Sequence, residues 1–433
     1  MKNTNILFII ATVLSMTIAS CTNFSKEEYE KFLDEMEQEA IASGEIVVLT
    51  HDILFDTDTC KDFNVIDIDV NRNEHNNLLS RKYLSLDLIY SQTEDAPSLT
   101  IKMPKELIDI LDINIVNDSL RIRVSDPSQL STLAKNSKRK GKIICNSTYL
   151  KALYSNSAGH IKFETPITTD SMLIELEGYN SVANFTELMT VKDFRLNFNG
   201  NRKVNLYGNF GKAVINASGA DSKLTVSENS TAKYMEINGQ QTTVMLPIEN
   251  PLKADTLIIN TNASKFAEIE VIAKHVDLNI ANSPDKTFSI DNLVANTLNL
   301  NVDNIDKGYI NTLTCDTISM ALNKITSLSA VNIKADILTV EASNSQDLWL
   351  MQGTMGYANV DISGDGNTEL YFHTDTLMCN ISGNVKCSAK NISKLLNITA
   401  SNNAQFTYDG KPEKINKTAT DNAKIINQKR KDK

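Results

Sequence analysis

The segment Leu298–Asn304 reads LNLNVDN, and its form recurs through the C-terminal two thirds of the 433-residue chain. Met172–Leu176 (MLIEL), Ala213–Ala217 (AVINA) and Val360–Ile362 (VDI) are further apolar alternations of this kind. A Gly or Asn recurs at intervals of 19 to 23 residues, in the series Gly159, Gly178, Gly200, Gly219, Gly239, Asn262, Asn282, Asn304, Asn323, Asn344, Gly364, Gly383 and Asn402. Because Gly and Asn tolerate positive φ, they suit a sharp corner. A fixed period of this size predicts a stacked repeat.

The repeat favours an all-β fold, a parallel β-helix-like solenoid of about 20 residues per coil. Each coil has a first strand that ends at the corner, a second alternating strand a few residues later, and a less regular third side. The second strands carry apolar pairs at Val204 and Leu206, Leu224 and Val226, Val244 and Leu246, Leu370 and Phe372, and Phe406 and Tyr408. Stacking buries inward side chains that one coil cannot bury alone. A meandering antiparallel sandwich is the alternative, but it would not require such uniform spacing.

A region without the corner series precedes the array and predicts a β-rich lead-in. Its expected strands are Asn64–Val70, Tyr83–Tyr90, Ser98–Met103, Ile113–Val116 and Ser119–Val124. The pair Asn117-Asp118 predicts a turn between the last two. The expected order is a signal peptide, an acidic tether or short helix, the lead-in, the array and a basic tail, over residues 1–20, 21–44, 45–146, 147–410 and 411–433.

Several motifs carry a family resemblance through their order and spacing. They are Leu107–Leu111 followed by Val116–Ile122 (VNDSLRI), the corners Ser157–Gly159, Ser218-Gly219, Ser363–Gly366 and Ser382-Gly383, and the ending Phe406–Pro412 (FTYDGKP). Over roughly residues 62–427 the chain resembles the putative autotransporter adhesin head family, the GIN domain family. The middle coils depart from that pattern, with Asn in place of Gly from Asn262 to Asn344. The resemblance implies an exported β-helical protein, with adhesion suggested by the family name alone.

The first residues predict the cellular address. Met1–Ser20 has a lysine at position 2, the apolar run ILFIIATVL and Ile18-Ala19-Ser20 before Cys21. The run is too short for a stable membrane span and is typical of an export signal. Ile-Ala-Ser-Cys resembles the bacterial lipobox, which implies cleavage before a lipidated Cys21 and an outer membrane lipoprotein. Several acyl chains on one residue give stable anchoring. An ordinary signal peptide cleaved elsewhere is the alternative.

The segment Ser25–Ala42 is rich in Glu, and its apolar residues recur at helical spacing. It predicts a short amphipathic helix or a tether. Ser25–Glu28 (SKEE) resembles the acidic export signals that carry lipoproteins of the Bacteroidetes to the outer face of the outer membrane. A solvated tether has the same composition, so a cell-surface position and a periplasm-facing position both stay open.

The net charge of −10 argues against nucleic acid as a partner, because phosphate binding needs clustered positive charge. The basic stretches Lys135–Lys142 and Lys429–Lys433 are the exceptions. We interpret both as solvated segments, with contact to acidic lipid or polysaccharide as the alternative. The expected partners are the membrane, through the lipid anchor, and polysaccharide or envelope or host surface proteins.

The cysteines and histidines predict no metal site and no cofactor. Five widely spaced cysteines follow Cys21, which is not the pattern of a disulfide framework. Neither a CxxC motif nor an HxH or HxxxH pair occurs, so zinc is not expected. Cys379 and Cys387 flank the corner at Gly383 and are expected to point into the coil as free thiols, with a local disulfide as the alternative.

Parallel β-helices also host polysaccharide lyases and hydrolases, so a carbohydrate-active enzyme is the rival hypothesis. Such sites need converging carboxylates with a basic residue. Asp361 and Asp365, the latter in the run Asp365-Gly366-Asn367, form the best cluster of acidic groups, but Asp365-Gly366 is typical of a turn, and no DxDxDG calcium loop is present. The sequence therefore predicts no catalytic residue and a non-catalytic role in adhesion, binding or assembly, with a periplasmic scaffold as a further possibility.

An Asp-Ser/Thr-apolar triplet recurs along the chain. Its hydroxyl residues are Ser119, Ser171, Thr256, Thr317 and Thr376. Asp and Ser or Thr side chains bond local backbone groups, so turn chemistry is one interpretation. The triplet also resembles the O-glycosylation acceptor motif of exported Bacteroidetes proteins, and both interpretations can hold together.

Trp349 is the single tryptophan and lies in Leu348-Trp349-Leu350. The alternation places either the Leu pair or the Trp on the outside. An exposed Trp would be a candidate contact for a sugar or a protein. A Trp that fills the core or is partly shielded is the plainer interpretation.

Overall fold

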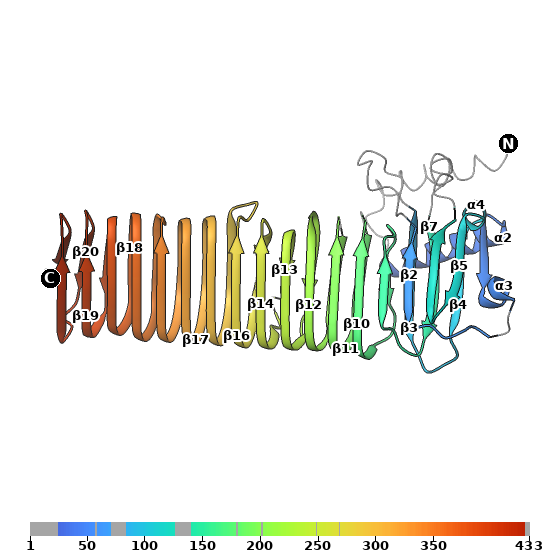
Figure 1. Ribbon diagram of the computed structural model, residues 1–433, viewed down its shortest axis with the longest axis horizontal. Helices are drawn as coiled ribbons and strands as arrows, with labels where there is room; N and C mark the ends of the chain where they lie inside the picture. The colour runs from blue at the N-terminus through green and yellow to red at the C-terminus, as the bar shows by residue number, and fades with distance from the viewer. Residues whose placement is uncertain are drawn as a thin grey trace.

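The computed structural model describes residues 25–56, 59–70, 84–125, 140–178, 181–200, 202–247, 249–267 and 269–428. These residues form one long rod (Figure 1). The rod is a β-solenoid of about 13 turns with about 21 residues per turn, preceded by further strands. The expected all-β solenoid is therefore confirmed. Among the described residues, no helix is long and apolar enough to cross a membrane.

The array consists of strands that pair in parallel with the coil before and the coil after. They are β10 (Ile167–Glu177), β11 (Ser181–Asn199), β12 (Arg202–Val226), β13 (Thr231–Met245), β14 (Leu252–Asn262), β15 (Lys265–Ala267), β16 (Glu270–Ala281), β17 (Thr287–Ser343), β18 (Asp347–Lys390), β19 (Ile392–Ala400) and β20 (Gln405–Asp409). Ile259 pairs with Leu278, and Leu278 with Leu300. This parallel register excludes the antiparallel sandwich for the array.

In-register stacking places each apolar position of one coil on the same position of the next. Leu298, Leu300 and Val302 are at most 2% exposed, as the alternation predicts. The apolar pairs expected on the second strands are buried as well. The core is thus a continuous column of aliphatic and aromatic side chains, and each coil covers the core of its neighbours.

At the end of the first strand, each coil has one residue with left-handed backbone. The residues are Gly178, Gly200, Gly219, Gln241, Ala263, Asn282, Asn304, Lys324, Asn344, Gly364, Gly383, Asn402 and Asp421. The predicted corners at Gly239, Asn262 and Asn323 are wrong by one or two residues. Gly239 is still inside the strand, paired with Ala217 and Thr261. The geometry, rather than residue type, sets the corner where the inward alternation ends.

Gly159 is a fourth position that differs from the prediction, because its backbone does not have the positive φ expected of a corner. A Cβ at Gly159 would overlap the carbonyl oxygen of Leu86, which belongs to β3 (Ser85–Gln92). The glycine is needed for close approach of two backbones. It lies at the contact between the lead-in and the array.

The lead-in combines antiparallel and parallel pairing. Its elements are α2 (Lys26–Ala42), β1 (Ile46–Thr50), α3 (His51–Phe55), β2 (Val65–Asp69), β3, β4 (Ser98–Pro104), α4 (Lys105–Ile108), β5 (Leu111–Val116), β6 (Ser119–Val124), β7 (Lys140–Ser147), β8 (Ala152–Ser155) and β9 (Ile161–Phe163). Strand β4 pairs antiparallel with β1 and β7. Strands β5 and β6 form a hairpin whose turn residues, Asn117 and Asp118, both have positive φ. The predicted turn is confirmed, and this geometry suits a two-residue hairpin loop.

The stack extends beyond both boundaries expected for the array. At the N-terminal side, β2 pairs in parallel with β8, and β3 with β9. At the C-terminal side, β21 (Lys414–Ala419) and β22 (Lys424–Asn427) pair in parallel with β19 and β20. Residues 414–427, which the sequence analysis assigns to a tail, therefore add another coil. Lys429–Lys433 and residues 135–139 of the other basic stretch lie outside the described residues.

Candidate functional site

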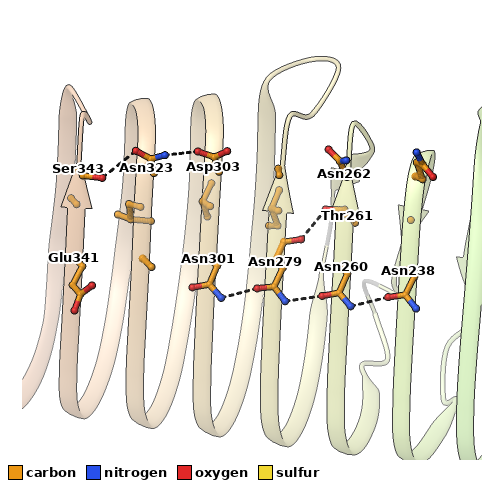
Figure 2. A pocket seen from close by; sticks show the side chains of 18 of the residues that line it. Asn238, Asn260, Thr261, Asn262, Asn279, Asn301, Asp303, Asn323, Glu341 and Ser343 are labelled. Atoms are coloured by element: carbon orange, nitrogen blue, oxygen red, sulfur yellow. Dashed lines mark hydrogen bonds between the residues drawn. The ribbon is translucent and has the colours of Figure 1, made fainter.

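A row of asparagines runs along the outer face of the first strands. In this row, the asparagine ladder, the amide of Asn238 donates to Oδ1 of Asn216 at 2.9 Å, and the amide of Asn260 donates to Oδ1 of Asn238 at 2.8 Å. The same bond joins Asn279 to Asn260 and Asn301 to Asn279, each at 2.7 Å (Figure 2). The complete ladder is Glu175, Asn197, Asn216, Asn238, Asn260, Asn279 and Asn301.

The parallel register explains the ladder, since identical amides on neighbouring coils lie one strand spacing apart, about 4.8 Å. Each amide nitrogen carries two N–H groups and each amide oxygen has two lone pairs. One donor and one acceptor per residue satisfy the ladder itself. The amide of Asn238 also donates to Glu236 at 3.0 Å, and the remaining groups of the other asparagines can bond a ligand lying along the rod.

A groove of about 1410 Å³ lies beside the ladder; we call it the asparagine groove. The ladder forms one wall, and the residues just before the corners form the other. In this second wall, Asn323 donates to Oδ1 of Asp303 at 2.6 Å (Figure 2). The floor is the backbone of the buried row between the walls, including Phe198, Ile280 and Val302. The groove exists because outward side chains at alternate positions stand above the inward-facing position between them.

The asparagine groove is acidic. Its charged lining residues are Glu175, Glu177, Asp303, Glu341 and Asp361, and its described lining contains no Lys or Arg. Ala321 interrupts the amide row after Asn301. The groove therefore suits a neutral or cationic ligand, and repels an anionic one.

A second groove of about 1390 Å³ follows the third side of the coils. Its walls carry both signs of charge, which pair across neighbouring coils. Lys274 lies 2.8 Å from Asp255, and Lys192 lies 2.7 Å from Asp170. These pairs are exposed and cancel much of each other's field, so this groove offers less selectivity than the asparagine groove.

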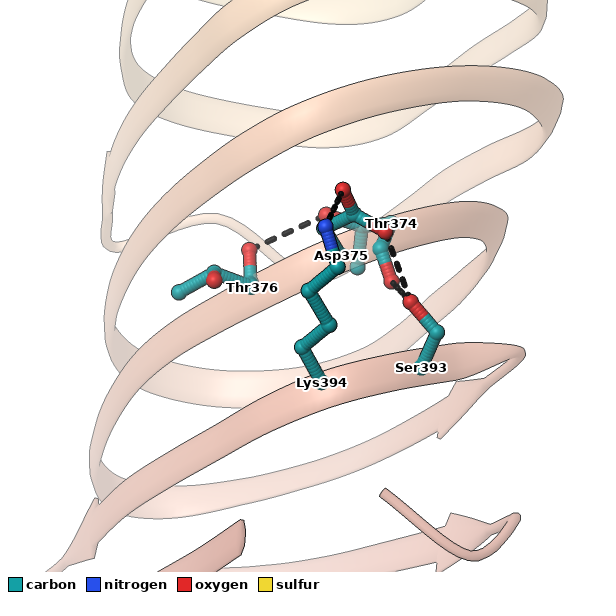
Figure 3. Close-up of polar contacts among 5 residues, drawn as sticks. All are labelled: Thr374, Asp375, Thr376, Ser393 and Lys394. Atoms are coloured by element: carbon teal, nitrogen blue, oxygen red, sulfur yellow. Dashed lines mark hydrogen bonds and ion pairs between the residues drawn. The ribbon is translucent and has the colours of Figure 1, made fainter. Parts of the chain in front are cut away.

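At the C-terminal end of this groove, the ion pair between Asp375 and Lys394 involves the first residue of the triplet Asp375-Thr376-Leu377. Asp375 accepts hydrogen bonds from Lys394 and Ser393, both at 2.7 Å (Figure 3). The bond from Lys394, then that from Ser393, holds the pKa of Asp375 below its usual value. Thr374 donates to the carbonyl oxygen of Thr376 at 3.0 Å. The bonds of Asp375 thus reach side chains of the next coil rather than local backbone groups, and Thr376 is partly exposed.

The other triplet residues divide into two groups. Ser171 is exposed, and Thr256 and Thr317 are partly exposed. Each lies immediately before a buried residue at the start of a first strand, as Thr376 does. Ser119 differs because it is 7% exposed and begins β6 in the lead-in. Four of the candidates for O-glycosylation therefore share one position of the coil, and the fifth, Ser119, is a buried residue that follows the exposed turn of a hairpin.

The structure also shows the surroundings of the single tryptophan and of two of the cysteines. Trp349 points outward and is half-buried, because Leu348 and Leu350 occupy the core. Cys379 and Cys387 are free and buried, and burial, then the hydrogen bond with Cys379, raises the pKa of Cys387. Cys21 lies outside the described residues.

Among the described residues, one charged side chain lies inside the rod. Arg202, at the start of β12, is fully buried and donates to the carbonyl oxygens of Ser157, at 2.6 Å, and of Glu177. Burial lowers its pKa to about 10, so the guanidinium remains protonated at neutral pH. Its bonds reach carbonyls of successive coils, which indicates a structural role at this corner.

The acidic residues considered for catalysis do not converge. Asp361 accepts a hydrogen bond from Asn380, and Asp365 accepts one from Asn384 at 2.6 Å. Each carboxylate is thus engaged with the asparagine of the following coil. Within the described parts of the chain, no three His, Cys, Asp or Glu residues are placed to hold a metal ion.

The sequence analysis missed the asparagine ladder, although the signal was present. An Asn recurs within the first-strand alternation at Asn197, Asn216, Asn238, Asn260, Asn279 and Asn301. The spacing equals the length of the coil. The spacing alone does not show that these amides contact one another, because that depends on the register between neighbouring coils.

Fold and surface together define a β-solenoid with long polar outer grooves. Residues 83–231 match the family described as "Putative auto-transporter adhesin, head GIN domain". This match confirms the resemblance expected from the sequence motifs, over that part of the chain. No curated protein matches the chain.

Three solved structures of bacterial proteins are similar to the chain at low identity. A putative lipid binding protein from Parabacteroides distasonis is 17% identical, with 89% of this chain and 98% of that chain covered and a TM-score of 0.25. A putative adhesin from Parabacteroides merdae is 14% identical, with 89% and 97% covered and a TM-score of 0.23. A putative adhesin from Bacteroides fragilis is 12% identical, with 88% and 97% covered and a TM-score of 0.21.

Proposed function

We propose that the protein is a non-catalytic adhesion or binding module of the cell envelope, which holds an extended ligand along the asparagine groove. The observation that carries this proposal is the unbroken hydrogen-bonded ladder from Glu175 to Asn301. A row of equivalent amides spaced by one strand favours a polymer with repeating polar groups over a small compact ligand. The adhesin description of the matched family supports the same role.

The acidic lining narrows the ligand to a neutral or cationic chain. A neutral polysaccharide or an extended basic segment of an envelope or host surface protein meets this requirement. Many equivalent contacts along a rod also make binding tolerant of register, because a shift by one coil restores the same contacts. Such binding gains strength from the number of contacts rather than from one deep pocket.

The test removes the centre of the ladder. The triple substitution Asn238→Ala, Asn260→Ala and Asn279→Ala should abolish retention on immobilised neutral polysaccharides or surface proteins that the natural chain binds. The matched control is Asn292→Ala, Asn311→Ala and Asn332→Ala, three exposed asparagines outside both grooves. Equal loss in both triple variants, or no loss in either, would contradict the groove as the binding surface.

A carbohydrate-active enzyme on the same scaffold is the rival, and a periplasmic scaffold is a third possibility. Incubation with acidic and neutral polysaccharides, followed by detection of new reducing ends or unsaturated products, separates catalysis from binding. Turnover that one acidic substitution abolishes would overturn the non-catalytic proposal. Crosslinking and pull-down from intact cells would show the partners of a scaffold.

Envelope anchoring through Cys21 is part of the proposal. The lipobox-like sequence before Cys21 supports it. A fatty-acid probe should label the natural chain and fail to label Cys21→Ala, and equal labelling of both would contradict lipidation at this residue. Protease treatment of whole cells would then distinguish the cell surface from the periplasmic face.

We also propose O-glycosylation at the four array positions Ser171, Thr256, Thr317 and Thr376. Their exposure supports access for a transferase, whereas the buried Ser119 should remain unmodified in the folded chain. Peptide mass spectrometry of protein from the native cells would show the added mass on each site. Modification confined to Ser119 would contradict the assignment by exposure.

A further inference from the structure

A second outer face, on the second strands, carries large aromatic side chains in a regular arrangement. Ser329 of β17 pairs with Trp349 of β18. Inside the core, a Cβ at Gly308 would contact both Phe288 and Leu328, so the three positions stack. The outward neighbours of these core positions therefore form one row, Ser289, Tyr309, Ser329 and Trp349, which we call the aromatic row.

The row alternates small and aromatic residues. Tyr309 is 46% exposed and has a serine on each side along the row, whereas Trp349 is half-buried and has Ser329 on one side. Two coils separate the aromatic rings, which places them about 10 Å apart along the rod axis. Ser329, which lies between the two rings, has a side chain too small to fill the space between them.

The spacing of the two aromatic rings along the rod matches the repeat of an extended glycan. In an extended β-linked glycan, alternate sugar rings present the same face on the same side of the chain. A pair of platforms that are two coils apart can therefore stack on every second ring. The C–H groups of the ring lie against the aromatic face while the hydroxyl groups point sideways.

A polar cavity of about 320 Å³ adjoins Trp349 on the following coils. Glu369, Lys386 and Gln405 line it. They offer donors and acceptors at the level where the hydroxyls of a stacked sugar would lie. Two acidic groups, Asp347 and Glu369, and one basic group, Lys386, line the cavity beside the ring, so the local charge disfavours an anionic ligand and leaves a neutral one accepted.

The neighbouring row extends the apolar surface. Met351 is 37% exposed, and Tyr371 is held by a hydrogen bond with Ser388 at 3.1 Å and by Lys390, whose Nζ lies 3.8 Å from the ring centroid. Tyr371 is thereby fixed in position before any ligand arrives. A preorganised aromatic surface loses less conformational entropy on binding.

We propose that the aromatic row is a glycan-binding site in which Tyr309 and Trp349 stack on alternate rings of an extended neutral glycan. Glu369, Lys386 and Gln405 bond its hydroxyl groups. This site is separate from the asparagine groove. It rests on the proposed function only in that the rod binds its ligand without cleaving it.

The single tryptophan makes the proposal directly measurable, because all indole fluorescence of the chain comes from Trp349. The probes are linear neutral hexasaccharides, namely cellohexaose, xylohexaose, mannohexaose and chitohexaose, with polygalacturonate fragments as an acidic comparison. At least one neutral probe should shift or quench the emission of the full-length protein. Calorimetry should show that Trp349→Ala and Tyr309→Ala each weaken the affinity for this probe by about tenfold or by a larger factor.

Matched variants protect this test against unfolding effects. Tyr357→Ala removes another exposed tyrosine, 39% exposed, outside the aromatic row, and should bind as the natural chain does. Trp349→Phe should retain part of the affinity because a platform remains. All variants should keep the natural thermal midpoint.

The outcomes separate the two proposals. Loss of glycan binding in Tyr309→Ala with retention in the asparagine triple variant supports the aromatic row independently of the groove. Failure of every neutral probe, preference for the acidic fragments, or equal behaviour of Tyr309→Ala and Tyr357→Ala would overturn the aromatic row. None of these outcomes alters the test of the groove.

Discussion

The lead-in and the array are both made of strands, but they are held together by different kinds of contact. In the array, Leu278 pairs with Leu300, and each strand contacts the coil before and the coil after. In the lead-in, Ile68 pairs with both Ile122 and Ser155, and β4 lies antiparallel between β1 and β7. The array is therefore stabilised by nearest neighbours, whereas the lead-in depends on contacts between distant parts of the sequence.

This difference predicts how damage spreads. A defect in a middle coil should open that coil and those beside it, because more distant coils keep their own neighbours. A defect in the lead-in should separate strands that are far apart in sequence.

The largest effect is expected for a charge inside a middle coil. Leu300 is fully buried, so Leu300→Asp should destabilise the array by about 3–5 kcal/mol, because an unpaired carboxylate would lie in the core. Limited proteolysis should then cut near residues 280–325 while the lead-in survives. Cooperative loss of the whole rod would contradict the nearest-neighbour account.

The control for this change is Asn304→Asp at the adjacent corner. Asn304 has φ of 55°, a conformation that Asp also tolerates. The substitution removes the hydrogen bond from its amide to Oδ1 of Asn282, 2.7 Å long and exposed. Its cost should be about 1 kcal/mol. Equal protease sensitivity of both variants would mean that the assigned register is wrong.

The next largest loss of stability is expected where the backbones of the lead-in and the array touch. Gly159→Ala would force its Cβ against the carbonyl oxygen of Leu86 and should cost about 2 kcal/mol. Gly356 is the control, because a Cβ there would approach only the carbonyl oxygen of Asp336, at 3.2 Å. Hydrogen exchange should increase in β3 and β9 of Gly159→Ala. Increased exchange confined to the distal coils would argue against this contact.

An ion-paired glutamate joins α2 to the lead-in strands. Glu37 lies 2.6 Å from Lys102 and 2.5 Å from Lys142. Burial raises the pKa of Glu37, but its hydrogen bonds with the two lysines outweigh that effect, so the pKa is lowered below its usual value near 4.5. The contact therefore stabilises α2 above that value, and the contribution is lost as pH falls through the lowered pKa.

This linkage predicts acid-dependent release of α2. Protease cleavage of α2 should increase below about pH 4.5, and Glu37→Gln should be cleaved more readily at neutral pH, with a loss of about 1–2 kcal/mol. Glu35→Gln is the control, since its pair with Lys31 is exposed and 4.0 Å long. A natural chain whose α2 cleavage does not depend on pH, or a Glu35→Gln variant with the same defect, would exclude the proposed role of Glu37.

Much of the fold follows from sequence because a solenoid repeats the same local rule. The alternation of Leu298, Leu300 and Val302 suffices to place them inward, and Asn282, Asn304 and Asn344 suffice to place three corners. The surfaces follow less readily. Whether Trp349 or its Leu neighbours face outward depends on the register of β18 against β17, and a short apolar run does not contain that information.

The corner errors have a physical cause as well. Residue type gives a tendency towards left-handed geometry, but the stacked coils set where the chain must turn. Asn323 therefore remains in the strand wall and bonds its neighbours, while Lys324 takes φ of 52°. The same reason explains why the asparagine ladder was missed. Its members matter through contacts between coils, which are visible only once the register is known.

The smallest expected effect tests this corner directly. Lys324→Gly should stabilise the array by about 1 kcal/mol, because glycine adopts positive φ without the steric cost that a side chain carries. Asn323→Gly should instead destabilise it by a similar amount. Asn323 donates to Asp303 at 2.6 Å and accepts from Ser343 at 3.1 Å, and glycine removes both bonds. Chemical denaturation of the two variants, one residue apart, should give shifts of opposite sign. If Asn323→Gly were the stabilising change, the corner would lie where the sequence alone placed it, and the register of this coil would need to move by one residue.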